Sequence, residues 1–118
     1  MPWNVNSLAI AAGFYIMKHY DRLLPDKAII REESLAFQKE LGKNKKLIVY
    51  PSDCNFFLVK SLAGPASELK KFLLDEFGIL IRNASNFTEL DKSFFRLAVQ
   101  QPEKNKLLTK GIKYWMQL

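Results

Sequence analysis

Two arginines, Arg82 and Arg96, have the side chains best placed to bind an anion. Arg82 follows the apolar run Ile79–Ile81, and Arg96 lies between Phe95 and Leu97. A guanidinium among apolar residues cannot stay both desolvated and unpaired. One interpretation is that each arginine forms a salt bridge or extends to the edge of a sheet. The other is that the pair holds a substrate carboxylate or phosphate through two-point contacts, which arginine makes and lysine cannot.

The remaining reactive residues do not form a recognisable catalytic set. His19 and Cys54 are the only histidine and cysteine, so the chain has neither a zinc-ligand set nor an internal disulfide framework. No serine or cysteine motif accompanies His19 as a nucleophile and base pair would require. The sequence also lacks a glycine-rich phosphate loop. No catalytic template that can be recognised in a local sequence therefore fits this chain.

Prolines and glycines separate the elements that must position the two arginines. The spacing of apolar residues predicts a helix from Asn4 to near Tyr20, a helix from Pro25 to Gly42 and a helix from Pro65 to Gly78. Strands are expected over 47–50, 55–60, 79–82 and 94–99, and a last helix begins at Pro102. This order predicts an α+β fold, a small and largely antiparallel sheet with helices on one face.

The first predicted helix is apolar over more than one face. Ala11, Phe14 and Met17 lie off the stripe that runs through Leu8 and Tyr15. A helix that is hydrophobic most of the way round requires burial. A domain of this size offers little room for it, so we expect a partner surface that this chain does not contain.

Composition is that of an ordinary globular chain of one domain. Of the 118 residues, 48% are hydrophobic and 25% are charged, which argues against disorder. No apolar run approaches the roughly 20 residues of a membrane span, and no signal peptide is expected. The net charge of +6 indicates a preference for anions and does not by itself indicate nucleic acid. The single cysteine fits a cytoplasmic origin.

Four motifs occur in order along the chain, and together they carry a family resemblance. They are Pro2-Trp-Asn-Val-Asn6, Tyr50 to Lys60, Gly78-Ile-Leu-Ile-Arg82 and Phe94-Phe-Arg-Leu-Ala-Val99. The chain resembles the C-terminal part of pyridoxal-phosphate-dependent class I/II aminotransferases, in the branches of threonine-phosphate decarboxylase and histidinol-phosphate aminotransferase. The segment from Ser85 to Arg96 favours the decarboxylase.

The resemblance implies that this chain is a fragment with a defined role. Residues 1–20 would be an interdomain linking helix, and 21–118 would be the small domain of a fold-type I enzyme. The large domain, with the lysine that holds pyridoxal phosphate, would precede Pro2, so the fragment alone is expected to bind no cofactor and to be inactive. Arg96 corresponds to the family's substrate-carboxylate arginine, and Arg82 to an arginine near the substrate phosphate. The complete enzyme would be a cytoplasmic homodimer acting on a phosphorylated amino acid.

Departures from the family pattern leave the branch open. Asn83 stands where aspartate is usual, and Gln100-Gln101 replace the usual residues after the last strand. A free-standing basic module that binds RNA through Phe56, Phe57, Phe94 or Phe95 is the alternative of another class, although adjacent phenylalanines point to opposite faces and no RNP1 pattern is present. A third hypothesis is a structural or dimerising module. Our preferred interpretation involves neither nucleic acid nor a membrane.

Overall fold

A four-stranded antiparallel sheet forms the centre of the protein. The computed structural model describes residues 5–117, and its strands are β1 (Leu47–Val49), β2 (Phe56–Ser61), β3 (Arg82–Asn83) and β4 (Phe94–Ala98). Their order across the sheet is β1-β2-β4-β3. The α+β fold with an antiparallel sheet predicted from the sequence is therefore confirmed.

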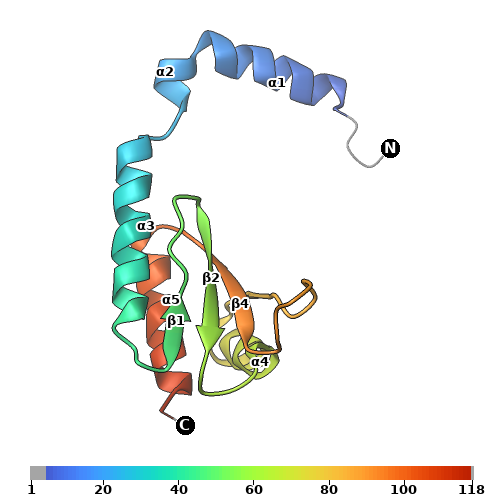
Figure 1. Cartoon of the computed structure of the whole chain (residues 1–118). Coiled ribbons are helices and arrows are strands. Elements are labelled where there is room, and N and C mark those ends of the chain that lie inside the picture. Colours follow the sequence, from blue (N-terminus) through green and yellow to red (C-terminus); the bar gives the residue numbers. More distant parts are fainter. Residues whose placement is uncertain (1–4, 118) are drawn as a thin grey trace.

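Three helices cover one face of this sheet (Figure 1). They are α3 (Lys27–Gly42), α4 (Ala66–Phe77) and α5 (Pro102–Trp115). The core joins their apolar residues to alternate residues of β2 and β4, namely Phe57, Val59, Phe95 and Leu97. Successive strand residues point to opposite faces, so the intervening residues of β2 and β4 lie on the face that the helices leave open.

The helix ends follow the residues that predicted them. The helix expected from Pro25 begins two residues later, at Lys27, because the Asp26 side chain caps α3 by accepting a hydrogen bond from the Ala28 backbone N–H at 2.8 Å. Gly78 ends α4 in the left-handed conformation, at φ 64°, where glycine is the least strained residue. Pro102 opens α5, where its missing N–H costs no intrahelical bond.

The segment before β3 corrects one predicted element. A strand was expected over 79–82, but β3 comprises Arg82 and Asn83 alone. The Ile79 N–H donates to the Leu73 carbonyl at 3.0 Å, so Ile79 completes the C-terminal cap of α4. The chain reaches β4 only after this cap, at Arg82.

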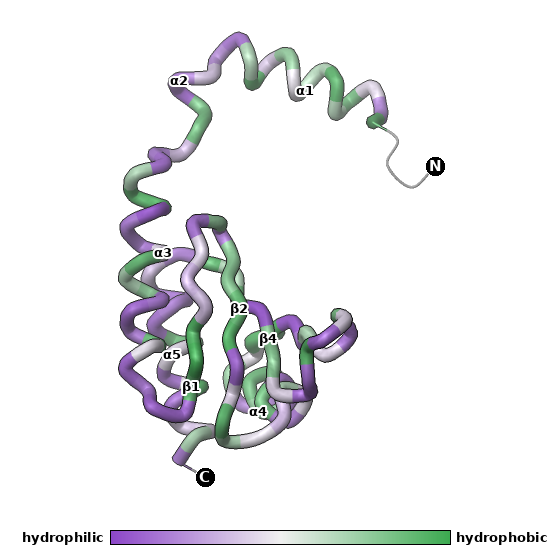
Figure 2. The backbone as a smooth tube through the Cα atoms, in the orientation of Figure 1, coloured by the Kyte–Doolittle hydropathy of each residue, from purple (hydrophilic) through white to green (hydrophobic). Residues whose placement is uncertain are grey.

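The N-terminal part of the chain lies apart from the sheet. The helix expected to end near Tyr20 is divided at His19 into α1 (Ser7–Lys18) and α2 (Tyr20–Leu23). Asn6 caps α1 through a 2.8 Å bond from the Ala9 N–H, whereas the predicted cap, Asn4, lies outside the described residues. Figures 1 and 2 show α1 extending away from the three core helices with hydrophobic stretches along it.

No residue of α1 is buried. Leu8, Phe14 and Met17 are 81%, 75% and 71% exposed, which is unusual for large apolar side chains gathered on one element. No helix among residues 5–117 is both long and apolar enough to cross a membrane.

Candidate functional site

The pairing of β3 with β4 brings the two predicted arginines together. Arg82 lies directly opposite Arg96 in the register, and Leu58 of β2 lies opposite Arg96 on its other side. Directly paired residues of antiparallel strands share a face. Because Phe95 and Leu97 face the helices, both arginines lie on the open face, two cations on adjacent strands.

The Arg96 guanidinium packs against an aromatic ring. Its central carbon lies 4.8 Å from the centroid of the Phe56 ring, and Arg96 is half-buried. Beside it is a hollow of about 390 Å³. The walls of this hollow are largely apolar and include Tyr50, Phe87 and Leu90. An anion entering it would meet the half-buried Arg96 guanidinium as its charged donor, beside largely apolar walls.

Neither arginine has an acidic partner in the described part of the chain. The ion pairs found among residues 5–117 involve Arg31, Lys43, Lys60 and Lys113 as the cations. The side chains of Arg82 and Arg96 donate no hydrogen bond within the same residues. A salt bridge of either arginine is therefore absent from residues 5–117. Arg82 is exposed on the edge strand β3, as the sheet-edge interpretation expects, and the N–H donors of both arginines are available to a ligand.

A third cation of the open face is already neutralised. Lys60 Nζ lies 3.0 Å from Asp91 Oδ2 and 4.9 Å from the centroid of Phe94. Hydrogen bonds from the Ser93 hydroxyl and backbone N–H, together with Lys60, lower the pKa of Asp91 to about 2. These contacts fasten the loop that carries Phe87 to the sheet, so this wall of the hollow is held next to Arg96.

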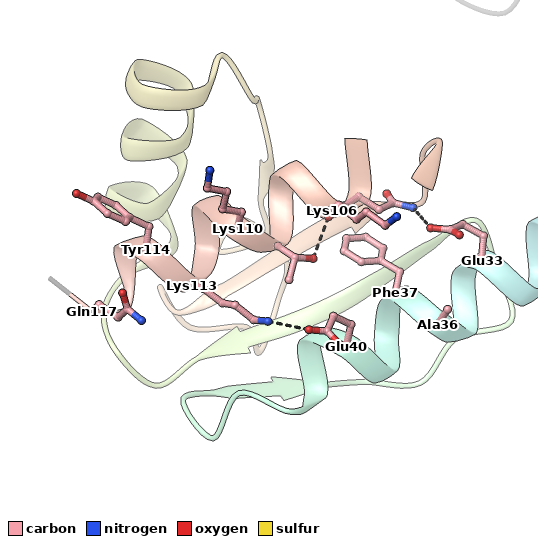
Figure 3. Close-up of a pocket in the computed structure, with 11 residues that line it drawn as sticks. Glu33, Ala36, Phe37, Glu40, Lys106, Lys110, Lys113, Tyr114 and Gln117 are labelled. Carbon is pink, nitrogen blue, oxygen red and sulfur yellow. Dashed lines mark hydrogen bonds and ion pairs between the residues drawn. The ribbon is translucent and has the colours of Figure 1, made fainter. Parts of the chain in front are cut away.

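A second hollow, of about 720 Å³, lies between α3 and α5 (Figure 3). Some of its polar groups are paired: Lys113 Nζ lies 2.7 Å from Glu40 Oε1, and Lys43, next to the hollow, lies with its Nζ 2.6 Å from Glu40 Oε2. Lys106 and Lys110 also line the hollow and form no ion pair within residues 5–117. The hydrogen bonds from Lys113 and Lys43 lower the pKa of Glu40 to about 2. The Asn105 amide donates to Glu33 at 2.8 Å. We interpret this hollow as a seam between two helices.

Comparison with known protein families identifies the family of this chain over most of its length. The family described as aminotransferase class I and II matches residues 6–112. The chain belongs to this family. The resemblance proposed from the four motifs is confirmed, and the aminotransferase family replaces the free-standing RNA-binding module as the class of this protein.

Relatives within the aminotransferase family come from two branches. A protein of Caldanaerobacter subterraneus subsp. tengcongensis, provisionally named threonine-phosphate decarboxylase, is 37% identical over 112 residues, which are 95% of this chain and 30% of that protein. Histidinol-phosphate aminotransferase of Chromobacterium violaceum is 32% identical over 95% of this chain and 31% of its own length. The chain thus spans about 30% of the length of the curated relatives it matches.

A solved structure agrees with the aminotransferase-family fold. L-threonine-O-3-phosphate decarboxylase from Porphyromonas gingivalis superposes with a TM-score of 0.90 at 35% identity. The superposition covers 97% of this chain and 35% of that structure. The predicted likeness to the small domain of fold-type I enzymes is therefore confirmed in its architecture.

The lysines of this aminotransferase-family chain do not fit a cofactor site. The family implies pyridoxal phosphate in the full-length enzyme, which such enzymes bind through a lysine Schiff base. Among residues 5–117 no lysine is buried; Lys60 and Lys70 are half-buried and the others are exposed. Lys60 is also engaged with Asp91. We therefore derive no step of the chemistry from a lysine of this chain.

Sequence reasoning missed Phe56 as a neighbour of Arg96. The two residues are 40 positions apart in the numbering, and their contact depends on the register of β2 with β4. The pair Phe56-Phe57 gave a partial signal, because adjacent strand residues must point to opposite faces. His19 is half-buried beside the Tyr15 ring, with 4.5 Å between the ring centroids, and Cys54 is exposed. Neither lines the hollow beside Arg96 or a further hollow of about 490 Å³ that Arg82 and Arg96 both line.

Proposed function

We propose that this chain is the C-terminal small domain of a pyridoxal-phosphate enzyme that acts on a phosphorylated amino acid, most like L-threonine-O-3-phosphate decarboxylase. Its role is to bind the anionic groups of the substrate. The observation that supports this role is the pair Arg82 and Arg96, opposite each other on the open face with no acidic partner among residues 5–117. Pyridoxal phosphate would be held by residues outside this chain.

The two arginines would divide the substrate between them. Arg96 would bind the carboxylate, because its planar fork matches two carboxylate oxygens and its half-buried position limits competition from water. Arg82, which is exposed, would bind the phosphate. Two contacts at opposite ends fix the position of a small flexible molecule, which is the largest contribution that a domain without catalytic groups can make to the rate.

The N-terminal elements would connect this domain to the rest of the enzyme. We assign residues 1–20 as the interdomain linking helix and 21–118 as the small domain. The exposed apolar residues of α1 support this assignment, because Leu8, Phe14 and Met17 offer a surface that residues 5–117 leave uncovered.

A second candidate is the small domain of a histidinol-phosphate aminotransferase, which the relative from Chromobacterium violaceum favours. The two candidates differ in the ligand that engages both arginines. Threonine phosphate carries a carboxylate and a phosphate, whereas histidinol phosphate carries a phosphate alone. Binding experiments with the two compounds therefore separate the candidates.

The test is a titration of the 118-residue chain followed through the Nε–Hε NMR signals of its four arginines, with Arg22 and Arg31 as internal controls. We expect O-phospho-L-threonine to shift the signals of both Arg82 and Arg96. L-Threonine should act mainly on Arg96, and inorganic phosphate or histidinol phosphate mainly on Arg82. Equal shifts at all four arginines, or none, would contradict the proposed function. Tighter binding of histidinol phosphate than of O-phospho-L-threonine, seen at Arg82, would favour the aminotransferase.

A further inference from the structure

We propose that Phe56 is a positioning residue for Arg96. Its ring holds the guanidinium by one flat face and leaves the N–H groups at the edge of the guanidinium free for an anion. This inference rests on the proposed function, because it concerns how the same arginine is prepared for its ligand. It adds an aromatic residue of β2 to a site so far built from two arginines.

The register of the sheet creates the contact. Phe56 is paired with Ala98 and Leu58 with Arg96, so Phe56 and Arg96 are diagonal neighbours on the open face. Diagonal neighbours lie within reach of aromatic and long side chains. The side chain opposite Phe56 is only the methyl group of Ala98, which leaves room for Arg96 to lie over the ring at 4.8 Å.

The chemistry of the contact suits a site that must receive an anion. A guanidinium stacks through its face and donates hydrogen bonds in its plane. A carboxylate in the place of Phe56 would occupy those donors, whereas a ring occupies none of them. The ring therefore restricts the rotamers of a long side chain, and the donors stay free.

Lys60 is a second cation that lies on an aromatic ring, but unlike Arg96 it also has a carboxylate partner. Lys60 lies over Phe94 at 4.9 Å, but its ammonium also binds Asp91 at 3.0 Å. The open face thus contains two cation–π contacts of similar distance, and only one of the cations is neutralised by a carboxylate. Arg96 is therefore the cation that an aromatic ring holds in place and whose N–H donors have no acceptor among residues 5–117.

The experiment compares variants of the 118-residue chain. Phe56→Leu removes the π face and keeps an apolar side chain, while Phe56→Tyr keeps the ring. Phe87→Leu is the matched control, because Phe87 is similarly exposed (47% against 42%) and lines the same hollow. Two quantities are measured: the chemical shifts of the Arg96 side-chain protons, which a ring beneath them moves upfield, and the dissociation constant for O-phospho-L-threonine.

We expect Phe56→Leu to abolish the upfield shift and to weaken binding about 2- to 5-fold, the size of a partly exposed cation–π contact. Phe56→Tyr should retain both properties, and Phe87→Leu should retain the Arg96 shift. An Arg96 shift unchanged in Phe56→Leu would overturn the inference. So would an affinity that Arg96→Ala reduces and Phe56→Leu does not. If Arg96→Ala itself leaves the affinity unchanged, the proposed function fails, and the positioning role fails with it.

Discussion

The open face of the sheet and the seam between α3 and α5 both gather cations, but they treat them differently. In the seam, Lys113 shares Glu40 with Lys43. On the open face, Lys60 has Asp91, whereas Arg82 and Arg96 have no carboxylate among the described residues. Only Lys113 joins two elements there, because it lies on α5 and Glu40 on α3, whereas Lys43 follows Glu40 at the end of α3 itself. Lys106 and Lys110 of the seam also lack a carboxylate but are exposed, whereas Arg96 is half-buried against the Phe56 ring, the arrangement expected of a cation that receives its anion from outside.

The largest expected effect is that of Arg96→Ala in the complete enzyme that carries this chain. Removing one partner of a desolvated charge pair costs about 2–5 kcal/mol. At about 1.4 kcal/mol per decade, kcat/KM should fall roughly 30- to 4,000-fold. Arg96→Lys should recover only part of this loss, because an ammonium lacks the planar two-point contact.

The control for Arg96→Ala is the melting temperature measured on the same preparation. We expect it to change little, since Arg96 forms no ion pair within residues 5–117. A large drop in melting temperature with normal turnover per folded molecule would mean that Arg96 stabilises the fold, as the cations of the seam do, and does not bind substrate.

Arg82→Ala should produce a smaller and selective effect. A hydrogen bond to a charged group contributes about 1.5–3 kcal/mol, so kcat/KM for the phosphorylated substrate should fall roughly 10- to 100-fold. The unphosphorylated analogue should be affected much less, because it lacks the group that Arg82 binds. Equal losses for both compounds would remove the assignment of Arg82 to the phosphate end.

The seam should respond to substitution through stability alone. Asn105 is buried, accepts a 3.0 Å hydrogen bond from the Gln100 N–H and donates to Glu33 and to the Gln100 carbonyl. Asn105→Ala removes the bonds to the backbone of the exposed residue Gln100 and to Glu33, each of which contributes about 0.5–1.5 kcal/mol to the free energy of unfolding. Denaturant unfolding measures this loss. Lys113→Ala is the test for affinity, because Lys113 lines the seam but neither of the hollows that contain Arg82 or Arg96. The affinity for O-phospho-L-threonine should stay unchanged in Lys113→Ala, and a loss would contradict the division between the two surfaces.

The smallest expected effect is the pH dependence contributed by Glu40. Its pKa in the folded chain, about 2, lies below the usual 4.5, so its stabilising contribution is complete above pH 4.5 and is lost as the pH falls towards 2. Glu40→Gln should lower the melting temperature at pH 7 and approach the wild type near pH 2. Glu76 is exposed and outside the ion pairs of residues 5–117, so Glu76→Gln should show no such convergence. A constant difference at every pH would exclude the ion pairs as its cause.

The fold was largely predictable because the residues that begin and end its helices act through their own local conformation. Gly78 and Pro102 end and begin helices through their own backbone properties, and the alternation around Phe95 and Leu97 predicts a strand with one buried face. The late start of β3 was not predictable, because it depends on the hydrogen bond from Ile79 to Leu73. Whether the arginines are paired depends on which residues face them across the sheet, and no local pattern contains that information.

The pairing of Arg82 with Arg96 also has a consequence for substrate length. Ladder hydrogen bonds keep the Cβ atoms of directly opposite residues about 4.5–5.5 Å apart, so any movement of the sheet carries both guanidiniums together. Their separation then varies only with side-chain rotamers, which limits the span of a molecule that both can hold at once. Transferring an arginine from position 96 to position 98 keeps it on the same face and displaces it by roughly 6.6 Å. Moving the arginine along β4 in steps of two residues would therefore change the preferred length of a ligand with two anionic groups, and the core residues would stay the same.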